Sequence, residues 1–356
     1  MKILFVTNYK DWNKDHIPFH KSFYGKCFAS FCNKEKNDFE SIYIPSATNI
    51  IKVLLYNVKF LLCVIRSNPD TVYCPINLYL IALVVFLKSL GVLKCKIYRW
   101  KYTPCVKSNN KIKNKILIKY YSAFDKVYFL TKTHMEDSIE CGILKDYQTR
   151  FINYGIDINW FDIYKNNNVS DNFIIISTGV ENRDLDTLCK SVIGTGLFLH
   201  IITKKKYLDL DNIAILKPYM KVSNIRIDFA EDLITKKIDV LDYIERSVAS
   251  SKCVAVCTKQ VNYGVGYTQV VESLPFGIPI LETCNKANPI DVEKFKIGFN
   301  ISIGNVELWK QKFLLLMHDE NISKEFGNNA RRLAMKEFNG IDVAQSIYED
   351  IIHIKQ

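Results

Sequence analysis

The chain has 356 residues, of which 48% are hydrophobic and 24% are charged. This composition excludes a disordered chain, and the length favours two domains of roughly 150–200 residues over a single core. The formal net charge is +11, which indicates an anionic partner. The basic residues lack the Arg-rich or aromatic-interleaved pattern of a nucleic-acid module, so a membrane surface or a phosphorylated ligand is favoured over nucleic acid.

The cysteines and the beginning of the chain bear on its compartment. Eleven cysteines occur without a C-x-x-C pair or a nearby pair of histidines, and we expect them to be reduced core residues. Met1 leads directly into an apolar run at residues 3–6, which leaves no room for a signal peptide. These features predict a cytoplasmic protein, where free thiols persist.

Strand-like runs alternate with amphipathic segments in the first half of the chain. The runs predicted to be strands are residues 3–6, 41–44, 71–74, 96–100 and 126–130. Such alternation predicts a parallel sheet covered by helices.

Two segments of this half are unusually apolar. Residues 78–92 are interrupted only by Lys88 and are shorter than the ~20 residues that span a bilayer, so they are predicted to form a buried helix. Residues 51–62 carry Lys52 and Lys59 seven positions apart, which predicts one polar stripe on an apolar helix. Such a face is suited to peripheral contact with the inner side of an anionic membrane.

The alternation pauses at residues 153–171, which are polar and rich in Asn, and then begins again. Strands are predicted at residues 173–177, 198–203, 225–229, 253–257 and 278–282, and a helix at residues 240–250. Residues 324–355 are predicted to form two helices, broken near Asn339 and Gly340. We therefore expect an acceptor-binding domain at residues 1–155, a donor-binding domain at 156–335, and a helix at 336–356 that packs back on the first domain.

The most informative stretch is residues 263–281. A glycine-containing loop at residues 264–266 opens a short helix that carries one acid, Glu272, and Gly277 and Pro279 end this helix and begin a strand. A loop-to-helix junction with small residues presents backbone N–H groups beside the positive end of the helix dipole, which suits a phosphate. Glu272, about one turn further on, suits a ribose diol.

Residues 272–280, with the sequence ESLPFGIPI, are similar to the E-A-x-x-x-G-x-P-V signature of the retaining GT-B glycosyltransferases of family 4. The resemblance implies an α/β fold of GT-B architecture, with two Rossmann-like domains whose parallel sheets face each other across a cleft. It implies that Glu272 binds the ribose of a nucleotide-sugar donor. It also implies that the preceding loop binds the diphosphate, through Gly266, Tyr267, Thr268 and Gln269.

The rest of the donor site shows one weaker match to the family's pattern and two departures from it. Residues 177–184 are similar to the family's S-x-G-R strand and loop, which implies that Gly179 contacts the donor. The family's Arg after this glycine is Val180 here, and its acid eight positions before Glu272 is Gly264. Arg183 is the nearest cation, and we expect it to neutralise the diphosphate leaving group as a donor-binding and catalytic residue. A solvated loop arginine is the alternative.

The sequence indicates the acceptor-binding residues less clearly than the donor-binding ones. His16 and His20 follow the first predicted strand, where the family's N-terminal loop approaches the sugar and the acceptor. Both are candidate acceptor-binding residues, and His20 is a candidate catalytic base. Ordinary surface histidines are the alternative. Many relatives have a His after the fourth strand, and this chain has Lys101 there, which makes Lys101 a third catalytic candidate.

The resemblance implies transfer of a sugar from a UDP- or GDP-sugar to a saccharide acceptor, with retention of the anomeric configuration. The positive charge and the apolar, Lys-striped helices suggest that the acceptor is a lipid-linked saccharide at the inner membrane face, as in surface polysaccharide biosynthesis. Asp209 and Asp211 fall in a Lys-rich stretch that reads as a turn, so no metal and no cofactor are expected. The alternatives are a GT-B nucleotide-sugar epimerase and an inactive nucleotide-sugar-binding protein, which Gly264 and Val180 keep open.

Overall fold

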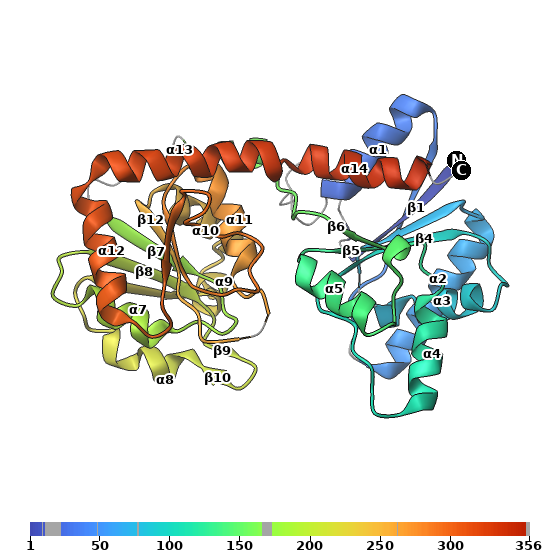
Figure 1. The fold of residues 1–356 in the computed structure, drawn as a ribbon, viewed down its shortest axis with the longest axis horizontal. Helices are drawn as coiled ribbons and strands as arrows, with labels where there is room; N and C mark the ends of the chain where they lie inside the picture. The colour runs from blue at the N-terminus through green and yellow to red at the C-terminus, as the bar shows by residue number, and fades with distance from the viewer. Residues whose placement is uncertain are drawn as a thin grey trace. The chain divides into compact units, whose positions relative to one another are not determined.

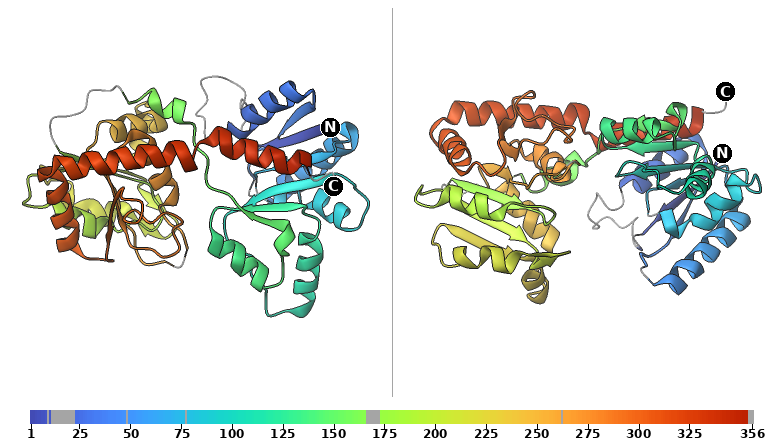
Figure 2. Two further views of the ribbon diagram at one scale, coloured as in Figure 1. Left: turned by 45° about the horizontal axis from the view of Figure 1, so that its top comes forward. Right: turned by 60° about the horizontal axis from the view of Figure 1, so that its bottom comes forward.

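A computed structural model describes residues 1–8, 10, 23–47, 49–76, 78–165, 173–261 and 263–353. The chain divides into two compact units (Figure 1). Unit 1 consists of Met1–Gly155 and Gly340–Gln356, and unit 2 consists of Ile156–Asn339. The chain therefore leaves unit 1 once and returns to it, so that both ends belong to unit 1 (Figure 2).

Unit 1 is built on a six-stranded parallel sheet in the order β2-β1-β3-β4-β5-β6. Its strands are β1 (Lys2–Thr7), β2 (Asp38–Tyr43), β3 (Thr71–Cys74), β4 (Lys96–Lys101), β5 (Lys126–Phe129) and β6 (Thr149–Phe151). Its α-helices are α1 (Phe23–Glu35), α2 (Ile50–Ser67), α3 (Ala82–Ser89), α4 (Lys111–Tyr121), α5 (Lys132–Glu140) and α14 (Gly340–His353).

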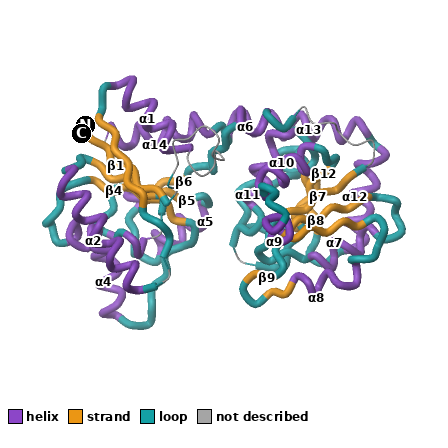
Figure 3. Tube along the Cα trace, turned by 180° about the vertical axis from the view of Figure 1, so that it is seen from behind, coloured by secondary structure: helices purple, strands orange, loops and turns teal. Residues whose placement is uncertain are grey.

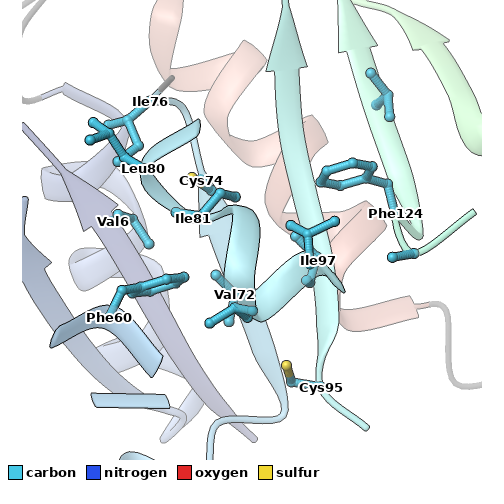
Figure 4. Packing of buried hydrophobic residues seen from close by; sticks show 14 of the residues in the cluster. Val6, Phe60, Val72, Cys74, Ile76, Leu80, Ile81, Cys95, Ile97 and Phe124 are labelled. Atoms are coloured by element: carbon cyan, nitrogen blue, oxygen red, sulfur yellow. The ribbon is translucent and has the colours of Figure 1, made fainter. Parts of the chain in front are cut away.

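The helices of unit 1 cover both faces of its sheet. Helices α2, α3 and α4 lie on one face, while α1 and α14 pack together on the other (Figures 1 and 3). The first face buries an apolar core between sheet and helices, in which Phe60 of α2 lies near Val72 of β3 and Phe124 lies beyond Ile97 of β4 (Figure 4). The strands are apolar on both faces because helices cover both.

The five strands predicted for the first half are present, with ends that differ by at most three residues. The three-residue strand β6 was not predicted, because so short a run carries little periodic signal. The buried helix predicted at residues 78–92 is only partly correct. Helix α3 is shorter than this range. Phe86 of α3 is 50% exposed, and Leu90 and Val92, which follow the helix, are 55% and 64% exposed, so the segment is only partly buried.

Unit 2 has a second six-stranded parallel sheet, in the order β11-β8-β7-β12-β13-β14. Its strands are β7 (Ile174–Thr178), β8 (Phe198–Thr203), β11 (Ile225–Phe229), β12 (Cys253–Val256), β13 (Ile280–Thr283) and β14 (Gly298–Ile301). A small antiparallel hairpin joins β9 (Lys206–Tyr207) to β10 (Leu210–Asp211). The α-helices of unit 2 are α6 (Ile158–Asp162), α7 (Leu185–Val192), α8 (Asn212–Leu216), α9 (Ala230–Thr235), α10 (Val240–Ala249), α11 (Tyr267–Ser273), α12 (Val306–His318) and α13 (Glu320–Glu337).

One face of the second sheet carries its main apolar core. Leu188 of α7, Leu216 of α8 and Trp309 of α12 meet the sheet there and are fully buried. Strand β14 and the hairpin were not predicted, whereas the break between the last two helices, α13 and α14, falls at the predicted Asn339 and Gly340. The expected turn is present at Asp209, between the two strands of the hairpin, whereas Asp211 is a correction because it forms β10 with Leu210.

The chain leaves unit 1 and returns to it at neighbouring residues. The N–H of Ile156 donates to the carbonyl of Phe338 at 2.9 Å, and Ile156 bridges Asn339. A Cβ atom on Gly155 would lie 2.8 Å from the Cα of Gly340, so only glycine permits the two segments to approach this closely.

All eleven cysteines are free thiols. Eight are buried as predicted, Cys63 and Cys141 are partly buried, and Cys284 is an exception because it lies exposed in the loop after β13. No helix in the described ranges is both long enough and apolar enough to cross a membrane.

Candidate functional site

The order in which the chain adds strands to the sheet of unit 2 reverses between the adjacent strands β7 and β12. From β7 the chain continues to β8 and β11 on one side, and from β12 to β13 and β14 on the other. The loops that follow β7 and β12 therefore diverge at the carboxyl ends of adjacent strands. In open α/β sheets this is where ligands bind. The two loops contain Gly179, Arg183 and Gly266, and the other predicted donor-binding residues lie in α11, which follows the second loop.

Arg183 connects these two loops. Its side chain donates from Nε to the carbonyl of Thr178 at 3.0 Å, from Nη1 to the carbonyl of Glu181 at 3.1 Å, and from Nη2 to Oε1 of Gln269 at 2.9 Å. The residue is 6% exposed, so it is not a solvated loop arginine. Burial lowers the pKa of Arg183 to about 10, which leaves the guanidinium charged at neutral pH.

Two glycines make room for this arrangement. Gly179 has φ of 97°, and a Cβ atom there would lie 2.4 Å from Nη2 of Arg183. Gly266 has φ of 83°, and a Cβ atom there would lie 2.4 Å from Cγ1 of Val256. Both positions combine a left-handed backbone with a close neighbour, so each requires glycine. The two glycines flank the guanidinium.

Tyr263 ties the two loops together and was not singled out in the sequence. Its hydroxyl donates to Oε1 of Glu181 at 2.8 Å and accepts from Nδ2 of Asn182 at 2.6 Å. Its carbonyl accepts from Nδ2 of Asn285 at 2.8 Å. The glycine loop is therefore fixed on both sides by side chains from neighbouring loops. An aromatic residue just before a glycine loop was the only sequence signal for this role.

Helix α11 begins at the predicted loop, with Gly266 as its N-cap residue. In its first turn Thr268 is exposed, whereas Tyr267 and Gln269 are buried. The amide of Gln269 accepts from Arg183 through Oε1, while its Nε2 is buried and has no hydrogen-bond partner. Buried donors are nearly always paired, so an unused donor in this position is a feature of a binding site.

Glu272 lies in the last turn of α11 and is partly buried. Glu245 of α10 was not among the predicted site residues. Its side chain is close enough to Glu272 for the charge of Glu272 to affect its pKa. Burial, and then the negative charge of Glu272, raise the pKa of Glu245 well above its usual value. Glu245 is 4% exposed, so of the two carboxyl groups Glu272 is the one that a ligand can reach.

Glu282 of β13 is a second buried carboxyl group beside these loops. It is 2% exposed, and its Oε2 accepts from Nδ2 of Asn288 at 3.1 Å. Burial raises the pKa of Glu282 to about 8. Asn288 belongs to the same loop as Asn285, so Glu282 helps to hold the segment that supports Tyr263.

The remaining predicted residues belong to unit 1. Lys101 is the last residue of β4, where Nζ donates to Oγ1 of Thr103 at 3.1 Å. Burial lowers the pKa of Lys101. His16 and His20 lie outside the described residues. The structure thus brings Gly179, Arg183, Gly266 and Gln269 together in unit 2, and places Lys101 at the carboxyl edge of the other sheet.

Acidic and metal-ligating side chains do not gather in the described ranges. No group of three His, Cys, Asp or Glu side chains in this part of the chain has the arrangement of a metal site. Asp211 instead caps α8, where its side chain accepts from the N–H of Ala214 at 3.1 Å.

Solved structures share this architecture over the whole chain. Sucrose-phosphate synthase from Thermosynechococcus elongatus has a TM-score of 0.73 at 12% identity, over 99% of both chains. The chain has the GT-B fold. HepE from Anabaena, solved in complex with UDP and glucose, has a TM-score of 0.63 at 12% identity over 99% of this chain and 100% of that one. A putative UDP-N-acetylglucosamine 2-epimerase from Listeria monocytogenes has a TM-score of 0.60 at 13% identity, over 98% and 95%.

At this level of identity these likenesses concern the GT-B fold alone. No protein-family model matches the sequence, and no curated protein matches it.

Proposed function

We propose that this GT-B chain is a glycosyltransferase that moves a sugar from a UDP- or GDP-sugar to a saccharide or lipid-linked saccharide, with retention of the anomeric configuration and in surface polysaccharide biosynthesis. One observation carries the proposal. At the switch point of unit 2, the buried cation of Arg183 and the unused donor of Gln269 adjoin a loop that only glycine can form. A carboxylate, Glu272, follows in the same short helix.

The chemistry required of such a site is to bind a nucleoside diphosphate and to stabilise it as a leaving group. Negative charge develops on the diphosphate as the bond to the sugar breaks, and fixed positive groups lower the energy of that transition state. Arg183 uses three of its five N–H groups on protein acceptors, so two remain for phosphate oxygens. In this proposal the guanidinium and backbone N–H groups replace a divalent ion, and Glu272 accepts from the ribose hydroxyls.

Binding of the nucleotide tests the donor site. Calorimetry should detect UDP or GDP binding to the full chain, and Glu272→Ala should weaken that binding by ~1–3 kcal/mol, because it removes charge-assisted hydrogen bonds. Glu325→Ala, which removes an exposed acid of α13, is the matched control and should leave affinity unchanged. Equal affinity of wild type and Glu272→Ala would show that the donor site is misplaced.

The two alternatives remain distinguishable. The first alternative is an epimerase, the activity named for the Listeria neighbour, which uses the nucleotide sugar without an acceptor. Incubation with UDP-N-acetylglucosamine alone would then yield an epimer, which the transferase proposal does not predict. A chain that binds UDP tightly but neither epimerises nor transfers from a panel of donors would be a binding protein.

The acceptor is assigned to unit 1. His16, His20 and Lys101 remain the proposed acceptor-side residues, with His20 as the candidate base. The positive charge of the chain supports an acceptor carried on a membrane, because it is concentrated in this unit. Between residues 41 and 124 there are 13 Lys and Arg and a single acid, Asp70, while the rest of the chain has 35 basic and 36 acidic residues. The net charge of the protein therefore comes from this segment.

The same segment exposes apolar side chains. Seven residues of α2 are 48–74% exposed, namely Ile50, Ile51, Leu54, Leu55, Val58, Leu62 and Ile65. Helix α4 exposes Ile112 and Ile116 among four lysines, and neither helix contains an acid. Because α3 packs between α2 and α4, the three helices present one basic, apolar surface. Such a surface suits peripheral contact with anionic lipid at the inner face of the cell membrane.

Vesicle binding tests this contact. Lys113→Glu combined with Lys115→Glu on α4 should weaken binding to vesicles rich in phosphatidylglycerol at least 10-fold at low salt, since each lysine near an anionic surface contributes about 1 kcal/mol. Lys217→Glu with Lys221→Glu, exposed lysines of unit 2, makes the same change of charge elsewhere. If wild type sediments with neutral and anionic vesicles alike, or with neither, the proposed contact with anionic lipid is wrong.

A further inference from the structure

Among the described residues of unit 1, one buried cation forms no ion pair with a carboxylate. Arg99 of β4 is 7% exposed, and no carboxylate in the described part of the chain forms an ion pair with it. Its Nε donates to the carbonyl of Trp100 at 3.0 Å, and its Cζ lies 5.4 Å from the ring centroid of Phe124. Its Nη1 is buried and has no hydrogen-bond partner. A buried charge without a partner is costly, so an anion is the missing element.

A second polar group beside Arg99 is also unused. The hydroxyl of Tyr120, at the end of α4, is buried and has no hydrogen-bond partner. The ring centroids of Tyr120 and Phe124 lie 6.2 Å apart, and Phe124 is also the ring that Cζ of Arg99 contacts, so both side chains adjoin Phe124. Two buried donors without acceptors therefore lie close together between β4 and α4.

Lys101 adds a second cation on the same face of β4. Side chains two positions apart in a strand point the same way, so Ile97, Arg99 and Lys101 share the face that packs on α3 and α4. Burial lowers the pKa of Lys101, and the charge of Arg99 lowers it further. Two cations thus lie close enough to repel each other, and no acid in the described ranges forms an ion pair with either of them.

The two cations lie toward the carboxyl edge of the sheet. Arg99 pairs with Cys74, the last residue of β3, and Lys101 is the last residue of β4. In Figure 4 the ring of Phe124, which Arg99 contacts, lies beyond Ile97 in the direction in which the strands end. Ligands of open α/β sheets approach from this edge.

We propose that Arg99, Tyr120 and Lys101 form an oxyanion subsite that binds a phosphate group of the acceptor. The assignment to the acceptor rests on the proposed transferase function, whereas the binding of phosphate does not. A guanidinium presents a planar fork to two phosphate oxygens, and a hydroxyl and an ammonium supply further donors to the others. A carboxylate offers only two oxygens, so a phosphate uses this set more fully.

The phosphate can belong to a soluble sugar phosphate or to a lipid diphosphate that carries the saccharide. Tyr120 lies on α4, whose exposed Ile112 and Ile116 belong to the basic, apolar surface described above. The subsite and that surface are therefore built on one helix, which fits either source. The experiment separates them.

The test uses the full chain with three probes, namely inorganic pyrophosphate, glucose 6-phosphate and farnesyl diphosphate, followed by calorimetry and thermal unfolding. Wild type should bind at least one probe and melt at a higher temperature in its presence. Arg99→Met should weaken that binding at least 10-fold and remove the shift. Arg332→Gln, an exposed arginine of unit 2, should change neither. UDP or GDP binding should persist in Arg99→Met.

The melting temperature without ligand separates a binding role from a structural one. If Arg99 serves a ligand, Arg99→Met should melt at the same temperature as wild type or higher, because an uncompensated charge has been removed. A lower melting temperature with unchanged probe affinity overturns the proposal, as does a wild type that binds none of the probes. Should Arg99→Met fail to fold, Tyr120→Phe removes one oxygen only and should weaken binding 3- to 10-fold, and unchanged affinity there also overturns it.

The remaining outcomes identify the ligand. Preference for glucose 6-phosphate supports the subsite with a soluble acceptor, and preference for farnesyl diphosphate supports it with a lipid-linked one. Loss of probe binding in Arg99→Met from a chain that binds neither UDP nor GDP supports the subsite while rejecting the donor site of unit 2.

Discussion

Arg183→Met is expected to abolish measurable UDP or GDP binding and to lower the free energy of unfolding by about 2–4 kcal/mol. The substitution removes the donors that satisfy the carbonyls of Thr178 and Glu181 and the amide of Gln269. Buried acceptors without donors are destabilising, and the loops after β7 and β12 lose the group that connects them. Calorimetry measures the loss of nucleotide binding, and urea unfolding followed by circular dichroism measures the change in the free energy of unfolding.

Two further variants show what is specific to Arg183. Arg246→Met removes an exposed arginine of α10 and should cost little stability, because its ion pair with Asp242 is solvated. Arg183→Lys keeps the charge but cannot reach three acceptors at once, so it should bind nucleotide more weakly than wild type. Retention of wild-type UDP affinity in Arg183→Met would show that the guanidinium has a structural role only.

Glu282→Gln is expected to stabilise the protein at pH 8 and to have little effect at pH 4.5. In the folded chain the pKa of Glu282 is raised by burial to about 8 from an ordinary value of 4.5. The folded protein therefore keeps a proton that the unfolded chain releases above pH 4.5. The contribution of this group to stability is complete below pH 4.5 and is lost as the pH rises toward 8.

Glutamine is neutral at every pH and so avoids this loss, which amounts to at most about 4 kcal/mol at pH 8. Urea midpoints measured at pH 5, 6.5 and 8 should show the difference between Glu282→Gln and wild type growing with pH. Glu325→Gln, at an exposed position, should follow wild type throughout. A difference that stays constant with pH would mean that Glu282 is ionised in the folded chain at neutral pH.

The architecture was accessible from the sequence because its signals are local and periodic. Buried parallel strands are short apolar runs, and ten of the strands were predicted on that basis. Strand β6 has three residues, and the hairpin of Lys206–Tyr207 with Leu210–Asp211 has two in each strand, too few for a period to appear. Residues 78–92 were expected to form a buried helix, and the structure exposes Phe86, Leu90 and Val92, because composition does not reveal which side of an apolar segment packs.

The sequence indicated only those parts of the candidate site whose residues are contiguous in the chain. The glycine loop and Glu272 adjoin each other in the chain, so their spacing was visible. Tyr263, Glu245 and Glu282 were missed because their contacts join loops that only the folded sheet brings together. Arg99 was missed for a different reason. A basic residue inside an apolar strand carries no sequence sign that its counter-ion is lacking.

The discontinuity of unit 1 has a consequence for its synthesis. Helix α14 covers the α1 face of the first sheet, where Tyr348 meets Phe28 and Phe31. These residues are separated in the chain by the whole of unit 2. During translation the first 155 residues therefore leave the ribosome with one apolar face covered only by α1, and α14 completes the cover only after the second sheet has been made. A ribosome that stops within residues 156–339 would release a nascent product whose first sheet lacks part of this layer, a substrate for chaperones and proteases.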